Sequence, residues 1–409
     1  MAEVRPFAAL RPRPELATRL CEPPYDVMSE EEARRLVEAN PLSFLRVSRP
    51  ETSLPRGTDP HAEATYVRAR AVFDALLADR VLQRDDAPAY YLYRQVMGAH
   101  CQTGVVAAAS CRDYLDGTIR KHELTRPDKE DDRVRHIEAL EAQTGPAFLF
   151  HRAVPALAAF IRQRTDGVPD VDFVAPDGVR HTTWTVGDRE GLTFLATQFA
   201  GMARLYIADG HHRSAAAARV FEKRRGAGGS GGFLSVIFPH DALQILPYHR
   251  VLKDLNGWSS GGLLGQLAEA FEIEDAAPEP NAAMAARTVG LYLEGHWRRL
   301  RFRPALTEAG EPADRLDVAL LQRHVLAPVF GIDNPRTSER IGFVGGIRGP
   351  AELERLVGSG ACACAFAMAP TGVEELMDIA DRGGIMPPKS TWFEPKLRDA
   401  LFCLPLWRR

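Results

Sequence analysis

Residues 205–220 read LYIADGHHRSAAAARV, and the rest of the chain is interpreted outward from them. The apolar residues 205–208 predict a short strand. The run after Arg213 predicts a helix, because alanine loses no side-chain entropy there. Gly210 lets the backbone turn sharply between the two without a Cβ clash. Such a turn directs backbone N–H groups and the positive end of the helix dipole toward whatever lies in front of it.

Four polar side chains surround this glycine: Asp209, His211, His212 and Arg213. A carboxylate, two imidazoles and a guanidinium at a strand–helix turn suit a phosphate group, with or without a metal ion. Each of these residues alone is more often structural, since Asp-Gly is a common turn dipeptide and an arginine pairs with any nearby carboxylate. Together they favour a functional site.

The composition places the chain among ordinary globular proteins. Its 409 residues accommodate two or three domains, and 45% of them are hydrophobic and 26% charged. A net charge of -3 gives no electrostatic footprint for nucleic acid or an anionic membrane. The N-terminus lacks an apolar signal core, and the six cysteines are scattered, without metal-site spacing. We therefore expect a cytoplasmic protein that binds neither nucleic acid nor membrane.

The pattern of elements predicts an α+β (mixed α/β) fold in three regions, 1–110, 111–256 and 257–409. Ser29 and Glu32 form a capping-box pattern that opens a helix ending near residue 39. The other expected elements are strands at 42–47, 89–93, 103–108, 145–150, 234–238 and 243–250, helices at 61–80, 153–164, 190–201, 261–272 and 316–330, hairpins at 171–186 and 289–303, and a proline-rich connection at 275–282.

The most charged stretch is 121–136, KHELTRPDKEDDRVRH. After Pro127 it predicts a helix with a solvated face held by i,i+4 pairs. Lys121, His122 and Glu123 precede this helix on a loop, where a salt-bridge cluster and a functional loop are equally compatible with the local sequence.

A third polar stretch, 385–396 (IMPPKSTWFEPK), contains too many prolines for a helix or a central strand. Its residues Lys389, Ser390, Thr391 and Lys396 could close over a polyanion. It could equally be a tail packed by Trp392 and Phe393, and both interpretations stay open.

These residue types suit phosphoryl transfer. Cationic groups and helix N–H donors hold nucleotide phosphates, an acidic residue anchors Mg²⁺, and a carboxylate accepts the proton of an attacking hydroxyl. Residues 209–213 supply the first two parts, and Glu123 is the candidate base. The sequence has neither a Walker A motif nor a kinase catalytic-loop signature.

Over nearly its full length the chain resembles the DUF1015 family, on residues 23–27, 121–125, 129–133, 206–213 and 386–396. More distantly, the Asp-Gly-His-His-Arg turn is similar to that of free-serine kinases of the ParB/sulfiredoxin-like superfamily. Those kinases also carry a His-Glu pair on a loop ahead of a helix, as His122 and Glu123 stand here. The resemblance implies a ParB/sulfiredoxin-like core at 111–256, with residues 151–204 as an insertion.

The resemblance further implies a kinase that makes O-phosphoserine from free L-serine and ATP or ADP with Mg²⁺. In that interpretation Glu123 is the base, Asp209 organises the metal or the phosphates, and His211 assists catalysis. The phosphate-binding residues are then Gly210, His212, Arg213 and His122, with Lys389 and Arg348 as contributors from the C-terminal region. The expected partners are a small-molecule substrate and a nucleotide, and a homodimer is left open.

Two other functions compete with the kinase. One is a nucleotide-binding regulatory protein without kinase activity. The other is a metal-dependent phosphohydrolase with Asp209, His211 and His212 as ligands, although adjacent histidines at a turn rarely converge on one ion. The kinase hypothesis requires that residues 209–213 be open to solvent and that the carboxylate of Glu123 lie nearby.

Overall fold

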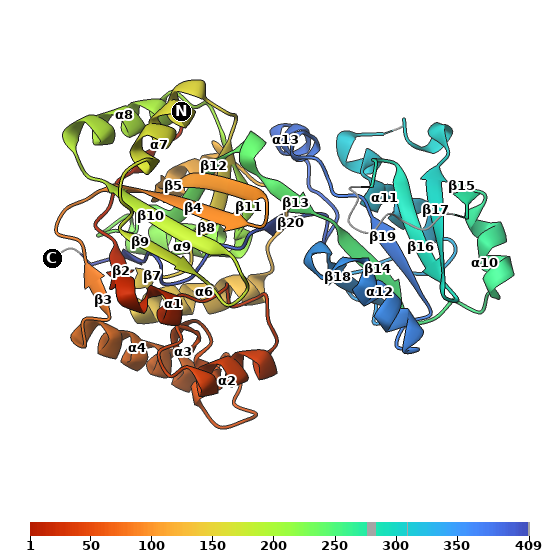
Figure 1. Cartoon of the computed structure of the whole chain (residues 1–409), viewed down its shortest axis with the longest axis horizontal. Coiled ribbons are helices and arrows are strands. Elements are labelled where there is room, and N and C mark those ends of the chain that lie inside the picture. Colours follow the sequence, from red (N-terminus) through yellow and green to blue (C-terminus); the bar gives the residue numbers. More distant parts are fainter. Residues whose placement is uncertain (276–283, 309, 408–409) are drawn as a thin grey trace. The chain divides into compact units, whose positions relative to one another are not determined.

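The structure is a computed structural model that describes residues 1–275, 284–308 and 310–407 (Figure 1). The chain packs as two compact units, Met1–Leu243 with Pro395–Arg409, and Gln244–Glu394. We call these the first and the second unit. This division differs from the predicted boundaries at 110/111 and 256/257. The strands on either side of residue 110 belong to one sheet, so a boundary there would cut that sheet.

A nine-stranded mixed sheet forms the centre of the first unit, in the order β6-β11-β8-β12-β5-β4-β10-β9, with β1 paired to β5. Strand β11 runs parallel to β6 and β12 runs parallel to β8, while the other pairs are antiparallel. The strands are β1 Val4–Arg5, β4 Tyr90–Met97, β5 His100–Ser110, β6 Ile119–Arg120, β8 Ala147–His151, β9 Val171–Val174, β10 Arg180–Val186, β11 Leu205–Asp209 and β12 Gly232–Pro239.

Helices pack on this sheet and on one another. They are α1 Ala17–Leu20, α2 Glu30–Ala39, α3 Leu45–Ser48, α4 Glu63–Ala78, α5 Cys111–Asp116, α6 Pro127–Leu140, α7 Pro155–Thr165, α8 Arg189–Ala200 and α9 His211–Arg224. The alanines of α9 are buried, and their small side chains let this helix lie close to the sheet and to α6. The predicted mixed α/β class is therefore confirmed.

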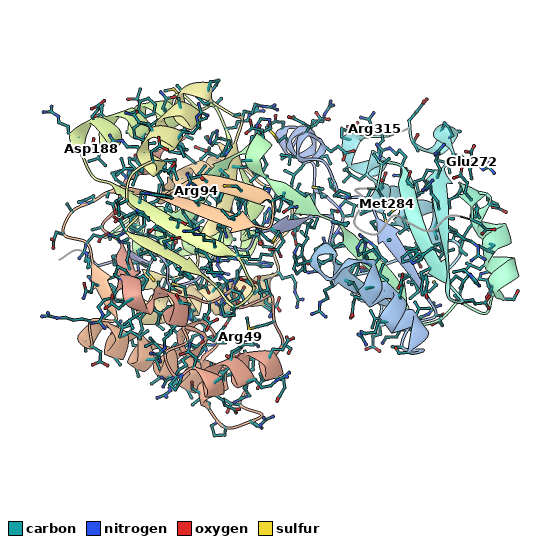
Figure 2. All side chains as sticks on the ribbon, in the orientation of Figure 1. Arg49, Arg94, Asp188, Glu272, Met284 and Arg315 are labelled. Carbon is teal, nitrogen blue, oxygen red and sulfur yellow. The ribbon has the colours of Figure 1, made fainter. Side chains whose placement is uncertain are left out.

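Two short strand pairs complete the first unit: β2 Leu10–Pro12 with β3 Leu82–Arg84, and β7 Ala142–Gln143 with β21 Leu404–Pro405. The second pair brings the C-terminal segment back to the unit in which the chain began. Figure 2 shows the side chains, and the labelled Arg94 extends from β4 with its guanidinium carbon 4.8 Å from the ring centre of Trp184 on β10.

Local signals predicted several elements correctly. The capping box opens α2, where the Ser29 N–H donates to Glu32 Oε2 at 2.8 Å and the Glu32 N–H donates to Ser29 Oγ at 3.2 Å. The hairpin of β9 and β10 is also present. The predicted strand at 42–47 is wrong. Residues 45–48 form α3, and Phe44 and Val47 are buried together in the core that also contains α4.

The charged face of α6 was predicted to be solvated and held by i,i+4 pairs within the helix, and this prediction is wrong. Its charges pair with neighbouring helices, since Arg135 contacts Glu63 on α4 at 2.8 Å and Arg219 on α9 contacts Asp131 at 2.7 Å. Asp132 is buried and accepts a 2.7 Å hydrogen bond from the hydroxyl of Tyr66. The charged run therefore packs α6 between α4 and α9.

The second unit contains an antiparallel six-stranded sheet in the order β15-β17-β16-β19-β14-β18. Its strands are β14 Tyr248–Leu252, β15 Phe271–Glu274, β16 Thr288–Leu293, β17 His296–Phe302, β18 Ile341–Gly345 and β19 Cys364–Met368. Its helices are α10 Ser260–Leu267, α11 Asp317–Leu321, α12 Gly349–Gly358 and α13 Val373–Asp381. A separate pair joins β13 Gln244–Leu246 to β20 Trp392–Glu394.

Three predictions in the second unit need correction. The strand expected at 243–250 is two strands interrupted at Pro247, which has no N–H to donate. The helix expected at 261–272 ends at Leu267, and residues 271–274 form β15. The helix expected at 316–330 is α11 followed by a wider π-helical turn, Gln322–Leu326. The predicted connection at 275–282 falls, apart from residue 275, outside the described residues.

Within the described ranges, no helix combines the length and the apolar character needed to cross a membrane.

Candidate functional site

The turn between β11 and α9 requires glycine at position 210. Gly210 has φ +89°, and a Cβ there would lie 3.1 Å from the Cα of Ala147 on β8. Helix α9 begins at His211, earlier than the sequence predicts, so both histidines lie in its first turn. No side chain caps this helix, and the first N–H groups of a helix have no acceptor within it. Residues 211–213 thus present backbone donors at the positive end of the helix dipole.

Asp209 lies at the end of β11 and is ionised. Its Oδ2 accepts a 2.9 Å hydrogen bond from Lys396 Nζ, and its Oδ1 accepts one from the Gly210 N–H at 2.6 Å. Burial alone would raise the pKa of Asp209, but the charges of Lys396 and Arg213 outweigh it and hold that pKa well below its usual range. The side chain keeps 30% exposure, so this carboxylate is reached by solvent, whereas Gly210 and His211 beside it are buried and residues 209–213 are not open as a group.

The loop that carries His122 and Glu123 meets the turn. The rings of His122 and His211 are in edge-to-face contact, with their centres 4.5 Å apart. One ligand atom from each of His122, Glu123 and His211 lies within 4.8 Å of the others. Residues nearly ninety positions apart in the sequence are thereby gathered at the N-terminus of α9, and Glu123 is among them.

The two facing imidazoles are neutral near pH 7. Burial lowers the pKa of His122 to about 4, although the charge of Asp209 and the Ile207 backbone act in the opposite direction. Burial also lowers the pKa of His211 well below its usual value, and His122 lowers it further. Both rings therefore offer nitrogen lone pairs and carry no positive charge for a phosphate.

His212 points elsewhere. Its Nε2 accepts a 3.1 Å hydrogen bond from the Arg126 N–H, which attaches the loop before α6 to the turn. Among the described residues, the group that could hold a metal ion is therefore His122, Glu123 and His211, and not the predicted set of Asp209, His211 and His212. His212 was singled out by its position beside His211, whereas its contact indicates a role in holding the loop.

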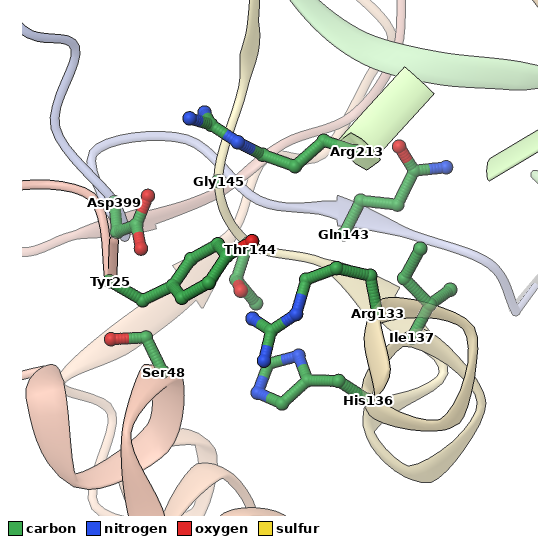
Figure 3. Close-up of a pocket in the computed structure, with 10 residues that line it drawn as sticks. All are labelled: Tyr25, Ser48, Arg133, His136, Ile137, Gln143, Thr144, Gly145, Arg213 and Asp399. Carbon is green, nitrogen blue, oxygen red and sulfur yellow. The ribbon is translucent and has the colours of Figure 1, made fainter. Parts of the chain in front are cut away.

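Arg213 stays close to the turn, with its guanidinium carbon 3.5 Å from where a Cβ on Gly210 would lie, and it lines a small pocket of about 30 Å³ (Figure 3). Its Nη1 donates to the Pro146 carbonyl. The pocket is lined by Tyr25, Ser48, Arg133, His136, Ile137, Gln143, Thr144, Gly145, Arg213 and Asp399. Two guanidinium groups and a buried carboxylate thus lie in the wall of one pocket.

Asp399 contributes that buried carboxylate. It is 3% exposed, and a Cβ on Gly145 would lie 2.5 Å from its Oδ1, so glycine makes room for the carboxylate. Burial raises the pKa of Asp399 to about 7, even though Arg213 and Arg133 act to lower it. At neutral pH this carboxyl group is therefore partly protonated.

Sequence reasoning did not assign Asp399, Arg133 or Tyr25 to the site, and it named Lys396 only as part of a loop that could close over a polyanion. Tyr25, Arg133 and Lys396 do lie in stretches that carry the family resemblance, which was the available signal. The predicted contributors Lys389 and Arg348 belong to the second unit. There Lys389 Nζ lies 3.4 Å from the hydroxyl of Tyr248, and Arg348 lies 3.9 Å from Glu352. Their roles toward a nucleotide stay predictions.

A family model described as "Protein of unknown function (DUF1015)" matches residues 4–319. Because this match spans most of the chain, the chain belongs to that family, as the sequence motifs indicated. No curated protein matches.

Several solved structures are weakly similar to the chain. A free serine kinase in complex with AMP has 17% identity and a TM-score of 0.37, covering 70% of this chain and 90% of that one. A conserved hypothetical protein from Pyrococcus furiosus has 16% identity and a TM-score of 0.34, covering 69% and 90%. C-terminally truncated SbnI from Staphylococcus aureus has 12% identity and a TM-score of 0.36, covering 74% and 87%. At these scores the likeness carries no argument about activity.

Proposed function

We propose that this protein is a small-molecule kinase that transfers a phosphoryl group from ATP or ADP to the hydroxyl of free L-serine. The observation that carries the proposal is the juxtaposition of Glu123 with the uncapped N-terminus of α9. A carboxylate that can accept a proton and a helix terminus that can hold phosphate are the two elements this reaction needs. Free serine is the acceptor implied by the resemblance of the Asp-Gly-His-His-Arg turn and the upstream His-Glu pair to those of free-serine kinases.

In the proposed reaction the N–H groups of residues 211–213 and the guanidinium of Arg213 hold the nucleotide phosphates. Glu123 accepts the proton of the serine hydroxyl while that oxygen forms a bond to the terminal phosphorus. The bond from that phosphorus to the bridging oxygen breaks, and the leaving nucleotide takes the electron pair, giving O-phosphoserine with ADP or AMP.

Mg²⁺ is the ion expected with the nucleotide. Asp209 fits it, because Mg²⁺ prefers oxygen ligands and is usually bound by one or two carboxylates together with substrate phosphates. Asp209 is ionised and partly exposed. When bound, Mg²⁺ supplies neutralisation of the charge that develops on the phosphate oxygens. Lys396, which already contacts Asp209, would bring a second cation to the same place.

We place the acceptor beside Arg213, where the polar groups match an amino acid and the pocket of about 30 Å³ would have to widen to admit it. A free amino acid carries a carboxylate and an ammonium group, and this pocket offers guanidinium groups from Arg133 and Arg213 and the carboxyl group of Asp399. An ammonium ligand would supply the positive charge that a buried carboxylate needs. Arg213 lines this pocket, and its charge also lowers the pKa of Asp209 in the turn, so it links the two parts of the proposed site.

The test is a screen of ATP, ADP and pyrophosphate as donors against free amino acids and polyols as acceptors, with the purified chain, read by phosphorus NMR. We expect O-phosphoserine as the product. Glu123→Gln should lower turnover by about 10²–10⁴-fold, the usual contribution of a general base, and leave nucleotide affinity nearly unchanged.

The matched control is Glu138→Gln, since Glu138 lies on α6 and pairs with Lys223 at the surface. Wild-type turnover in Glu123→Gln would remove Glu123 from the mechanism. Nucleotide binding without turnover of any acceptor would favour the regulatory alternative over the kinase.

A further inference from the structure

His122, Glu123 and His211 form a compact group of potential metal ligands at the N-terminus of α9. The first two residues belong to the loop between β6 and α6, and the third begins α9. Each offers one ligand atom, and these atoms all lie within 4.8 Å of one another. Ligands around one ion lie closer together than this, so a small inward movement of side chains would complete the site.

The two imidazoles are buried without the partners that buried polar groups normally have. His122 is 2% exposed and His211 is 5% exposed. Among the described residues, Nδ1 and Nε2 of His122 and Nε2 of His211 have no well-formed hydrogen bond. Most buried polar atoms in native proteins are satisfied, and each neutral imidazole has one nitrogen with a free lone pair, so the two rings point to a ligand that accepts one lone pair from each.

The donor set selects the kind of ion. Imidazole nitrogen suits Zn²⁺, Co²⁺, Ni²⁺ and Fe²⁺, whereas Mg²⁺ and Ca²⁺ take oxygen ligands. Two histidines and one glutamate, with a coordination position left for water, are also the ligand set of one class of zinc enzymes. We propose that His122, Glu123 and His211 bind a divalent transition-metal ion of the Zn²⁺ or Co²⁺ class.

The surroundings supply charge of both signs. The carboxylate of Asp209 interacts electrostatically with both imidazoles and would offset part of the charge of the ion. The positive charge of Lys121 acts against binding of a cation. The ammonium group of Lys121, however, lies over the ring of Tyr114, 4.0 Å from the ring centre. Glu123 is only partly buried and gives the ion a route from solvent.

Binding of the ion also has a consequence for the reaction, and this part rests on the proposed function. A carboxylate that coordinates a metal ion is a weaker base, because the positive charge of the ion disfavours protonation and so opposes transfer of the serine proton to Glu123. A transition-metal ion at this site should therefore inhibit phosphoryl transfer, while Mg²⁺, which avoids such ligands, should not.

The experiment measures binding directly, so it does not depend on kinase activity. The full chain, freed of metal by a chelator, is titrated with Zn²⁺ by calorimetry and with Co²⁺ by visible absorption. We expect one equivalent to bind. His122→Ala and His211→Ala should each weaken binding by at least about tenfold, on the scale of lost metal contacts. Asp209→Asn and His212→Ala, which alter the alternative ligand set, should retain the stoichiometry.

The matched control is His296→Ala, because His296 is an exposed histidine in the second unit. Circular dichroism of each variant establishes that it is folded, and His122→Gln replaces His122→Ala if the alanine variant is not. Absence of Zn²⁺ and Co²⁺ binding by the folded wild type, or equal binding by the His122 and His211 variants, would overturn the site. Metal binding in a protein that makes no phosphoserine would leave the site standing and refute only the kinase.

Discussion

The two units of the chain bury different kinds of residue. Around β11 and α9 the first unit buries titratable groups, namely His122, Asp132, His136, His211 and Asp399. In the second unit the residues of β19, Cys364–Met368, are all buried and none carries a formal charge. A buried charge there, Arg250, is held by the backbone carbonyls of Tyr248 and Lys389 instead of a carboxylate. The second unit also buries His249 and Glu394, but fewer titratable groups than the first. Because burying such groups costs stability, this difference favours the first unit as the place of the proposed site.

The largest expected effect comes from comparing a buried ion pair in the first unit with an exposed ion pair in the second. The side chain of Arg133 in the first unit is only 12% exposed, contacts Asp132 and lies over the ring of Tyr25 at 3.9 Å from its centre. Arg355 in the second unit pairs with Glu352 at 2.7 Å but is 63% exposed. We expect Arg133→Gln to lower the free energy of unfolding by about 3 kcal/mol or more, because it leaves Asp132 buried without the guanidinium.

The matched change Arg355→Gln should alter the same quantity by less than about 1 kcal/mol, since exposed pairs contribute little. Urea denaturation of both variants measures the difference. Equal losses would mean that the buried pair is no more important to stability than the surface pair.

Glycines in left-handed backbone give the second test. Gly210 has φ +89° and Gly295, at the tip of the β16–β17 hairpin, has φ +79°. Alanine at either position incurs about 1–2 kcal/mol of backbone strain. Only at Gly210 would the new Cβ also meet backbone, 3.1 Å from the Cα of Ala147, whereas nothing lies within 4 Å at Gly295.

We therefore expect Gly210→Ala to lower the free energy of unfolding by about 2–4 kcal/mol and Gly295→Ala by about 1–2 kcal/mol. Gly210→Ala should also weaken nucleotide binding, because the clash displaces the first turn of α9. Thermal denaturation and nucleotide titration of both variants measure these effects. If the free energy of unfolding falls equally in the two variants, the close approach of Ala147 on β8 to Gly210 does not add to the cost of the substitution.

The pH dependence of stability gives the third test, through Asp399. Its pKa is about 7 in the folded protein, against 3.8 for the ordinary side chain, so the folded state holds the proton more tightly. The stabilisation from this proton is present below about pH 4 and is lost as the pH rises toward about 7. The groups that face it are Arg213, Arg133 and Arg398, which lower its pKa, and Asp26, which raises it.

Between about pH 5 and pH 7, the free energy of unfolding of the wild type should therefore fall by on the order of 1–2 kcal/mol relative to that of Asp399→Asn. The buried histidines shift stability in the opposite direction, but they are common to both proteins and cancel in the difference. Denaturation at several pH values gives the two curves. Parallel curves would show that Asp399 titrates in its ordinary range.

The sequence was informative where a structural signal is local. The capping box of Ser29 and Glu32 and the turn at Gly210 each lie within a few residues of the element they define. The strand predicted at 42–47 is wrong, because an apolar run this short fits both the two-residue period of a strand and the 3.6-residue period of a helix. Residues 45–48 form a helix, which packs in the core that also contains α4. The division into two units was not predicted because the first unit is discontinuous in sequence.

The same distinction applies to the candidate site. Residues 209–213 could be recognised as a group because they are adjacent, and the approach of Glu123 followed from a resemblance. Asp399 could not be recognised, since the chain returns to the first unit only at Pro395, after completing the second unit. Lys396 was named as a residue that could close over a polyanion, but its contact with Asp209 was not predicted. The polar stretch 385–396 was interpreted as one loop, but its two lysines belong to different units.

Those two lysines provide the last and smallest test. Lys396 is 15% exposed and forms an ion pair with Asp209 at 2.9 Å. Lys389 is exposed and contacts the hydroxyl of Tyr248 at 3.4 Å. Removing the charge of Lys396 leaves a partly buried carboxylate without its partner, so Lys396→Met should raise the pKa of Asp209 and weaken phosphate binding.

We expect Lys396→Met to lower nucleotide affinity about tenfold, and Lys389→Met to lower it less, because an exposed ammonium is well solvated and screened by salt. Calorimetric titration with ATP and ADP at two salt concentrations measures both. A larger loss in Lys389→Met would assign the nucleotide to the second unit and reverse the comparison between the units. A loss confined to Lys396→Met that persists at high salt would place the phosphate contacts in the first unit, where a partly buried pair is weakly screened.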